Sequence, residues 1–275
     1  MNWYKVLAHD LTCGLLRKRY LAAIFIFLLP CISLWMELRT YGGGSFMDYL
    51  LSCFCGAKRI TGKAGEPAIA MPVRWILAVG ASLYLNLDYF LGDMTLFGQQ
   101  ILVRCSNRCS WFWSKCLWNI LACTEYVCIG CITVFLFTAI TGGTLSLFNT
   151  STLAPVLFQD SVALPLSLSI PQGLTIGLIL PLATMIALNL LEMTLCLYVK
   201  PIIAFIICML LLVLPLFWDS PLALSIGAMA IRSAFVVESG IHAASSAGVV
   251  AAVIVGSVFA GCNRFRRVDI LGLEE

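Results

Sequence analysis

Long apolar runs separated by short polar segments constrain this chain more than any other feature of its sequence. Of its 275 residues, 61% are hydrophobic and 11% are charged, whereas a soluble domain typically carries about 25% charged residues. A soluble protein of this length cannot hide so much apolar surface, because its own surface needs polar cover. The sequence therefore predicts an all-α polytopic membrane protein, a single transmembrane domain over 1–275 in contact with the lipid bilayer.

Six of the apolar runs are long enough to cross a hydrocarbon core, which takes about 20 residues of helix. Before the first run, residues 2–19 place leucines and a tryptophan at helical spacing and end in a basic cluster. This pattern predicts an amphipathic helix that lies in the headgroup plane. The six transmembrane helices are predicted over 20–38, 73–94, 116–141, 173–197, 201–218 and 243–262.

A shorter apolar segment, 46–56, lies between the first and second predicted spans and is too short to cross. We interpret it as an interfacial or partly re-entrant helix; if it crossed, the topology of everything after it would invert. Six spans place both termini on one side, and eleven of the 17 lysines and arginines then fall on that side. Because cations are enriched in cytoplasmic segments, this bias predicts cytoplasmic termini.

Motifs for catalysis, metal binding or nucleotide binding are missing from the sequence. Six of the 13 cysteines fall inside apolar runs, where cysteine acts as a small hydrophobic residue, and the CxxC of Cys128 and Cys131 has no second pair or histidine partner. There is no P-loop and no HExxH, and the cations form short clusters beside apolar runs, which indicates membrane anchors. We therefore expect no catalytic residue, metal, cofactor or nucleic-acid site on this chain.

Three polar side chains fall inside predicted spans: Glu125, Asn189 and Glu192. Such residues are costly in lipid and usually face the interior of a bundle or a water-filled path. They are candidates for a translocation pathway or gate. For Glu192 the favoured alternative is a position near the cytoplasmic end of its span, from which the side chain snorkels close to Lys200. For Glu125 both interpretations stay open.

A charged, aromatic segment over 95–118 lies between the second and third predicted spans. Arg104 and Arg108 are spaced i and i+4, which places them on one face of a helix. We interpret the segment as a cytoplasmic helix on which another protein docks, with ordinary membrane anchoring as the alternative for each arginine. Its remaining cation and its tryptophans, typical of the aromatic belt at a membrane surface, are Lys115, Trp111, Trp113 and Trp118.

In its order of features the chain resembles the type-2 ABC exporter permeases, the membrane subunits of ATP-driven exporters, in their small Firmicutes-type form. The resemblance covers nearly the whole chain but rests on degenerate motifs. These are RKRY at the first span (17–20), LDYFLGDM (87–94), GQQILVRCSNRCSWFWSKCLW (98–118), GAMAIR (227–232) and FRRVDIL (265–271).

The resemblance implies a coupling segment over 95–115 that sits in a cleft of a separate ATPase. That ABC ATP-binding subunit, expected in two copies, would hold ATP and Mg²⁺. A second copy of this chain or a related permease would complete the pathway in the plasma membrane. The implied coupling residues are Gln99, Gln100, Arg104, Arg108, Trp111 and Lys115.

Short outer segments favour a small amphiphilic cargo, such as a peptide, lipid or drug. The main alternative is a six-span substrate-binding, immunity or sensor membrane protein without its own transport cycle. An intramembrane enzyme is disfavoured because no paired catalytic groups occur, and an ion-driven carrier because the sequence has no internal repeat.

Overall fold

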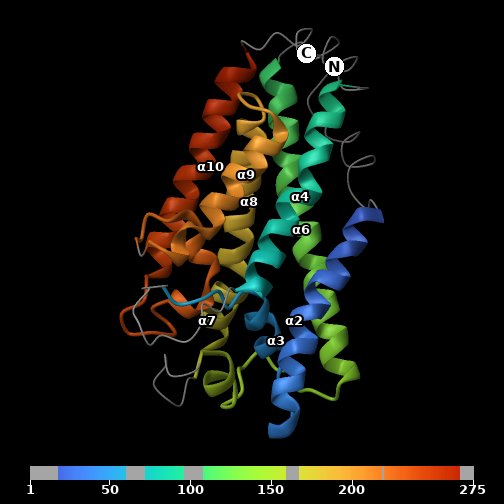
Figure 1. Ribbon diagram of the computed structural model, residues 1–275, viewed down its shortest axis with the longest axis vertical. Helices are drawn as coiled ribbons and strands as arrows, with labels where there is room; N and C mark the ends of the chain where they lie inside the picture. The colour runs from blue at the N-terminus through green and yellow to red at the C-terminus, as the bar shows by residue number, and fades with distance from the viewer. Residues whose placement is uncertain (1–17, 60–71, 96–107, 159–166, 219, 267–275) are drawn as a thin grey trace.

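The computed structural model describes residues 18–59, 72–95, 108–158, 167–218 and 220–266. These parts of the chain are helical, with two isolated bridges and no strand. Helices occupy each of the six ranges in which spans were predicted. The long helices that run along the molecule in Figure 1 are α2 (Ala22–Leu38), α4 (Val73–Thr95), α6 (Arg108–Ile140), α8 (Leu180–Leu195), α9 (Pro201–Val213) and α10 (Ala243–Phe265).

Four stretches of the described chain are long and apolar enough to cross a membrane. Two of these stretches include short irregular turns. The 3-10 turns Lys18–Leu21 and Arg39–Tyr41 flank α2, and α7 (Ile170–Leu174) continues through a π-helical turn into α8. Val73–Leu87 and Pro201–Leu216 are shorter apolar helices. This is the architecture of a helical membrane protein. The four stretches are Lys18–Tyr41, Trp111–Ile140, Ile170–Leu195 and Ala243–Phe265.

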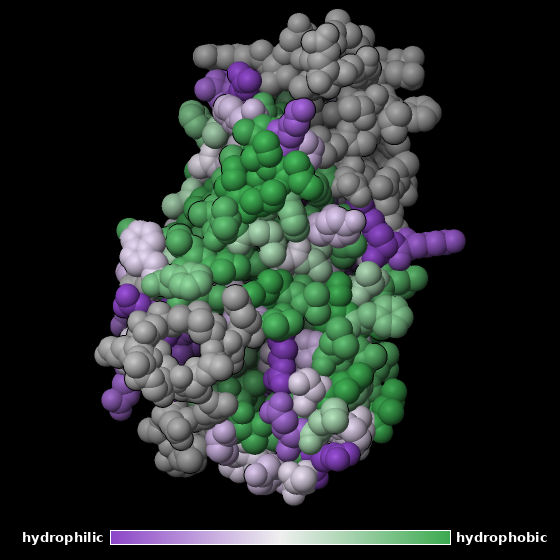
Figure 2. All heavy atoms as spheres, in the orientation of Figure 1, coloured by the Kyte–Doolittle hydropathy of each residue, from purple (hydrophilic) through white to green (hydrophobic). Residues whose placement is uncertain are grey.

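The surface between the two ends of the bundle is apolar. Figure 2 shows a broad hydrophobic area across the middle of the visible face, with hydrophilic residues above it, at both side edges and in a strip on the lower half. Phe25 on α2 is 69% exposed, Leu210 on α9 is 65% exposed and Phe259 on α10 is 75% exposed. An exposed apolar surface of this extent marks contact with lipid, where helices satisfy their own backbone groups.

One end of the bundle, called the upper end from its place in Figure 1, carries Lys200 and Arg266. The last turns of α8 and α10 meet the first turns of α6 there. Trp111 of α6 stacks on Phe265 of α10 with ring centroids 4.9 Å apart, and the Arg264 guanidinium donates to the Leu197 carbonyl at 3.5 Å. The amphipathic helix predicted over 2–19 lies almost wholly outside the described residues.

A short helix, α3 (Phe46–Cys53), is enclosed by α2, α4 and α6 and by the π-helical turn Thr175–Ile179. Every side chain from Met47 to Cys53 is buried. Of the two interpretations of 46–56, a partly re-entrant helix agrees with this burial better than one that lies on the surface, because protein surrounds the helix. An eight-residue helix is too short to cross a membrane by itself, so its burial depends on the longer helices around it.

A buried carboxylate fixes the start of α3. The Asp48 side chain accepts from the Ser45 backbone N–H at 2.8 Å, and the Ser45 hydroxyl accepts from the Asp48 N–H at 3.2 Å, which completes a capping box. Thr150 donates to the same carboxylate through its backbone N–H at 3.0 Å and its hydroxyl at 2.8 Å. Burial nevertheless raises the pKa of Asp48. This contact ties the loop after α6 to α3.

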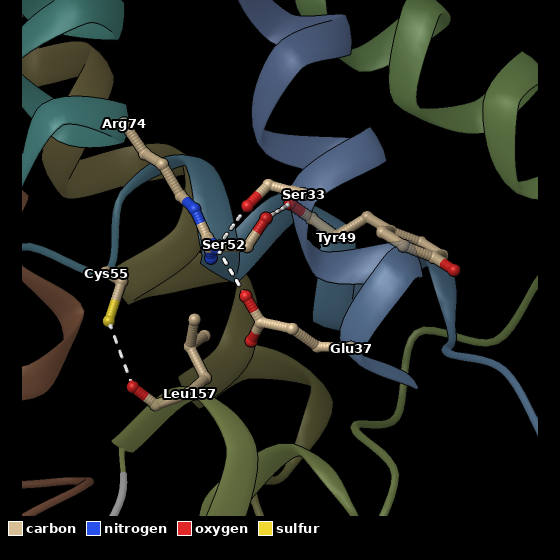
Figure 3. Close-up of polar contacts among 7 residues, drawn as sticks. All are labelled: Ser33, Glu37, Tyr49, Ser52, Cys55, Arg74 and Leu157. Carbon is tan, nitrogen blue, oxygen red and sulfur yellow. Dashed lines mark hydrogen bonds and ion pairs between the residues drawn. The ribbon is translucent and has the colours of Figure 1, made fainter. Parts of the chain in front are cut away.

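Polar contacts also join α2 to α4 near α3 (Figure 3). The Arg74 guanidinium donates to the Ser33 hydroxyl at 2.6 Å and to the Glu37 carboxylate at 2.9 Å. The Arg74 and Glu37 side chains are 29% and 46% exposed, so in water this ion pair would contribute at most about 1 kcal/mol. Nearby, the Ser52 hydroxyl donates to the Tyr49 carbonyl at 2.7 Å and the Cys55 thiol to the Leu157 carbonyl at 3.8 Å.

Small residues such as Ser257 and Gly261 let α10 pack closely against α8 and α6. The Thr194 hydroxyl of α8 donates to the Ser257 carbonyl of α10 at 2.9 Å. Gly261 of α10 lies against the Phe112 ring of α6, so that a Cβ added there would clash with the ring. Gly256, on the same helix, faces open space.

We expect Gly261→Ala to destabilise the protein by about 1–3 kcal/mol, because the added methyl group overpacks the contact with Phe112. Gly256→Ala is the matched control on the same helix and should be neutral or slightly stabilising, since its methyl group meets nothing and alanine favours a helix. Thermal unfolding of the detergent-solubilised protein measures both. Equal melting temperatures for the two variants would contradict the packing described for α6, α8 and α10.

Candidate functional site

A small polar cavity lies inside the bundle, between α4, α6 and α8. Asn86 of α4, Asn119 of α6, and Asn189 and Glu192 of α8 line it. Its volume of about 10 Å³ is close to the room that one water molecule needs. The remaining wall residues are Leu87, Met193 and Cys196.

The asparagines of α4 and α8 belong to a hydrogen-bonded chain that crosses three helices. The Tyr20 hydroxyl, at the start of the first helix, donates to Asn86 Oδ1 at 2.7 Å. Asn86 Nδ2 donates to Asn189 Oδ1 at 2.9 Å. Asn189 Nδ2 in turn donates to the Met185 carbonyl at 2.9 Å and to the Ser82 hydroxyl at 3.3 Å. Every amide in this chain has partners, which fixes its orientation and that of the cavity wall.

Helical spacing explains how the sequence assembles this wall. Ser82 and Asn86 are four residues apart on α4, so both face α8. Asn189 and Glu192 are three residues apart on α8, so the Asn189 amide and the Glu192 carboxyl both lie on the face of α8 towards α4 and α6. Asn119, which is 3% exposed, completes the site from α6. Close helix packing thus converts isolated in-span polar residues into one cluster.

Glu192 is the residue in this cluster whose polar group is not satisfied by the protein. Its side chain is 2% exposed, and within the described ranges its buried Oε1 makes no hydrogen bond and no ion pair. Lys200 lies exposed after the end of α8 and does not pair with it. The interpretation that Glu192 snorkels towards Lys200 is therefore wrong. An unpaired carboxyl inside a membrane bundle is expensive to retain, which points to function.

The third in-span candidate, Glu125, does not reach this cavity. It is half-buried on α6 and is not among the residues that line the cavity. The structure therefore brings together two of the three predicted pathway residues, Asn189 and Glu192, and places Glu125 apart from them.

The predicted coupling residues fall into two groups. Gln99, Gln100 and Arg104 lie outside the described residues, and Arg108 begins α6. Trp111 and Lys115 lie in the first turns of α6 and are buried, with the Lys115 ammonium 5.0 Å from the centre of the Trp111 ring. In this conformation neither side chain is available to a second protein.

The expectation that the tryptophans form a belt at the membrane surface is wrong for two of the three. Trp111 and Trp118 are each 1% exposed, whereas Trp113 is 51% exposed. The physical reason is that residues 108–115 are not a separate surface helix, because α6 runs without a break from Arg108 to Ile140. One side of its first turns packs against α8 and α10, and Trp111 lies on that side.

Two walls of the cavity come from Asn86 and Asn119, which were not among the predicted site residues. The signal was present, because both are amides within apolar runs predicted to be spans. Considering every in-span amide together with the in-span acids would have found them. Their convergence on Glu192 depends on which faces α4 and α6 turn towards α8, and this is not encoded in spacing along one helix.

Comparisons of the chain with protein-family models, with curated proteins and with solved structures give no match. The functional assignment therefore depends on the fold and on the geometry of the polar cavity.

A site that is retained for function should lower stability, and Glu192 provides the test. We expect Glu192→Met to stabilise the protein by about 1–3 kcal/mol, because it removes a buried polar group that has no partner among the described residues. Asn189→Leu, one helical turn away, should destabilise it by a similar amount, because Asn86 Nδ2 loses its acceptor. Melting temperatures in detergent compare the two variants. A strong destabilisation by Glu192→Met would show that the carboxyl holds the bundle together.

Proposed function

We propose that this chain is the membrane subunit of a transport system, with a pathway that passes the polar cavity of Asn86, Asn119, Asn189 and Glu192. The observation that carries the proposal is the buried Glu192 carboxyl, which lines a polar cavity in an apolar bundle without a charged partner among the described residues. In-span acids of this kind characteristically belong to substrate or ion pathways. A cavity with room for one water molecule corresponds to a closed state of such a pathway.

In its finer form the proposal is an ATP-driven exporter of the type-2 ABC permease kind. All six long helices then cross the plasma membrane, including α4 and α9, and the upper end faces the cytoplasm. The cations at that end support this orientation, since Lys200 and Arg266 follow α8 and α10 there. The chain carries no nucleotide-binding motif, so the energy for transport comes from a separate ATPase with its own ATP and Mg²⁺.

The docking surface for this ATPase is proposed between the end of α4 and the start of α6. Because Trp111 and Lys115 are buried in the bundle, the contact rests on Gln99, Gln100, Arg104 and Arg108. A continuous α6 suits this role mechanically, since a push on its first turn is transmitted along 33 residues of helix to the opposite end. Two ATPase copies and a second permease complete the assembly, and the cargo is a small amphiphile.

The experiment uses the chain co-expressed with a candidate ABC ATP-binding subunit. Arg104→Glu combined with Arg108→Glu should abolish co-purification, because two cations on the docking surface are replaced by repelling charges. Arg39→Glu combined with Lys58→Glu is the matched control, with the same charge change at two exposed cations outside the docking segment. Retained co-purification in the first pair would refute the docking surface.

A second variant separates the pathway from the docking surface. Glu192→Gln should leave the ATPase bound and lower ATP-driven transport of fluorescent amphiphiles into inverted vesicles by about tenfold or more. Glu238→Gln, at an exposed carboxyl, serves as its control. Unchanged transport in Glu192→Gln would remove the cavity from the pathway.

The second candidate function is a membrane sensor or immunity protein. The small volume of the cavity favours it, since a closed site whose asparagines are held by hydrogen bonds suits a static binding element. A chain that purifies without any ATPase would support this candidate over the exporter.

A further inference from the structure

Two cysteines meet at the upper end of the bundle although 153 residues separate them in the sequence. Cys109 is the second residue of α6, and Cys262 lies in the last turn of α10. The Cys262 thiol donates to the Cys109 sulfur, and the two sulfur atoms are 2.8 Å apart. This is closer than the 3.5–4.0 Å, roughly, at which unbonded carbon atoms settle, although sulfur is larger. The two helix ends therefore hold these sulfurs, the thiol pair, almost at bonding distance.

An arginine completes the arrangement. Arg266 Nε donates to the Cys109 sulfur at 2.8 Å, so this sulfur accepts from both a cation and the Cys262 thiol. The same contact raises the pKa of Arg266. A cationic donor favours the thiolate, which is the reactive form of cysteine. Within the described ranges, Cys109 is the only cysteine that accepts a hydrogen bond from an arginine.

Access to the pair is unequal. Cys109 is 6% exposed, whereas Cys262 is partly exposed and Arg266 is exposed at the end of α10. A small reagent from the aqueous phase therefore reaches Cys262 first. Cys109, which accepts a hydrogen bond from Arg266, is placed to react second, as the resolving cysteine. Other cysteines such as Cys53 and Cys208 are buried among apolar helices, where thiols are inert.

We propose that Cys109 and Cys262 form a reversible redox site that exchanges with small-molecule disulfides such as oxidised glutathione. Cys262 loses its proton to water and attacks one sulfur of the disulfide, which releases one glutathione thiolate. The Cys109 thiolate then attacks the Cys262 sulfur of the mixed disulfide and releases the second glutathione. The two leaving thiolates take up the two protons, so two protein thiols are oxidised and one glutathione disulfide is reduced.

The bond would lock the first turn of α6 to the last turn of α10. In a reducing compartment such a bond is transient and forms when small-molecule disulfides accumulate. The redox site stands on its own geometry and does not need the proposed function. If the chain is the proposed exporter subunit, the lock falls directly after the docking segment, and oxidation would hold back the motion that the ATPase drives through α6.

The test uses the purified full chain incubated with oxidised glutathione, followed by peptide mapping under non-reducing conditions. We expect one predominant cross-link, between the peptides of Cys109 and Cys262, which dithiothreitol reverses. Cys262→Ser should remove it, and Cys208→Ser is the matched control that should not. Cross-links that join Cys262 mainly to another cysteine, or no cross-link at concentrations that oxidise the unfolded chain, would overturn the proposal.

Arg266 is a positioning and activating residue in this scheme, and its variants report on that role. Arg266→Gln should slow the conversion of the mixed disulfide at Cys262 into the cross-link about threefold, because the Cys109 sulfur loses its cationic hydrogen-bond donor. Arg266→Lys keeps the cation and should restore most of the rate. Arg264→Gln, two residues earlier, should leave it unchanged. Equal rates for Arg266→Gln and Arg264→Gln would refute the activation by Arg266, and the mapping above would still decide whether the pair forms.

Discussion

The apolar surface of this bundle has to be in contact with lipid, and the rest of the structure depends on that constraint. Side chains such as Phe25, Ile140 and Phe259 are largely exposed, and no soluble fold leaves so much apolar area in water. In lipid the backbone must satisfy itself, which explains why the described parts of the chain are helical. It also explains why a helix as short as α3 lies inside a ring of longer ones.

The same constraint gives the polar groups in the interior their significance. Each buried amide of α4 and α8 has a partner, so the chain from Tyr20 to Asn189 stabilises the contact between these helices. Glu192 differs, because the carboxyl is enclosed in the same bundle without a partner among the described residues. Native membrane helices rarely keep such a group unless it takes part in function. The contrast between satisfied amides and an unsatisfied acid therefore locates the functional site more sharply than in-span polarity alone.

Hydropathy predicted where the helices lie, because the thickness of the bilayer sets the length of apolar helix that is needed to cross it. It did not predict the burial of α3, since an eight-residue apolar segment fits an interface and a bundle interior equally well. The aromatic-belt pattern placed Trp111 and Trp118 at the membrane surface, whereas packing against neighbouring helices buries both. Of the four polar residues in the cavity, the sequence predicted Asn189 and Glu192 but not Asn86 and Asn119. The latter two come from α4 and α6, and only tertiary packing decides which faces of these helices turn towards α8. The contact of Cys109 with Cys262 has no sequence signal at all.

Lipid, and not water, covers the exposed apolar side chains, and chemical labelling of Cys128 tests this most directly. Cys128 lies exposed within α6, in the middle of a predicted span. In reconstituted vesicles we expect a lipid-soluble maleimide to label it and a charged, water-soluble thiol reagent to leave it unmodified from either side, as peptide mapping would show. If water and not lipid covered Cys128, the charged reagent would reach this thiol and label it readily. Rapid labelling of Cys128 in vesicles by the charged reagent would contradict the account.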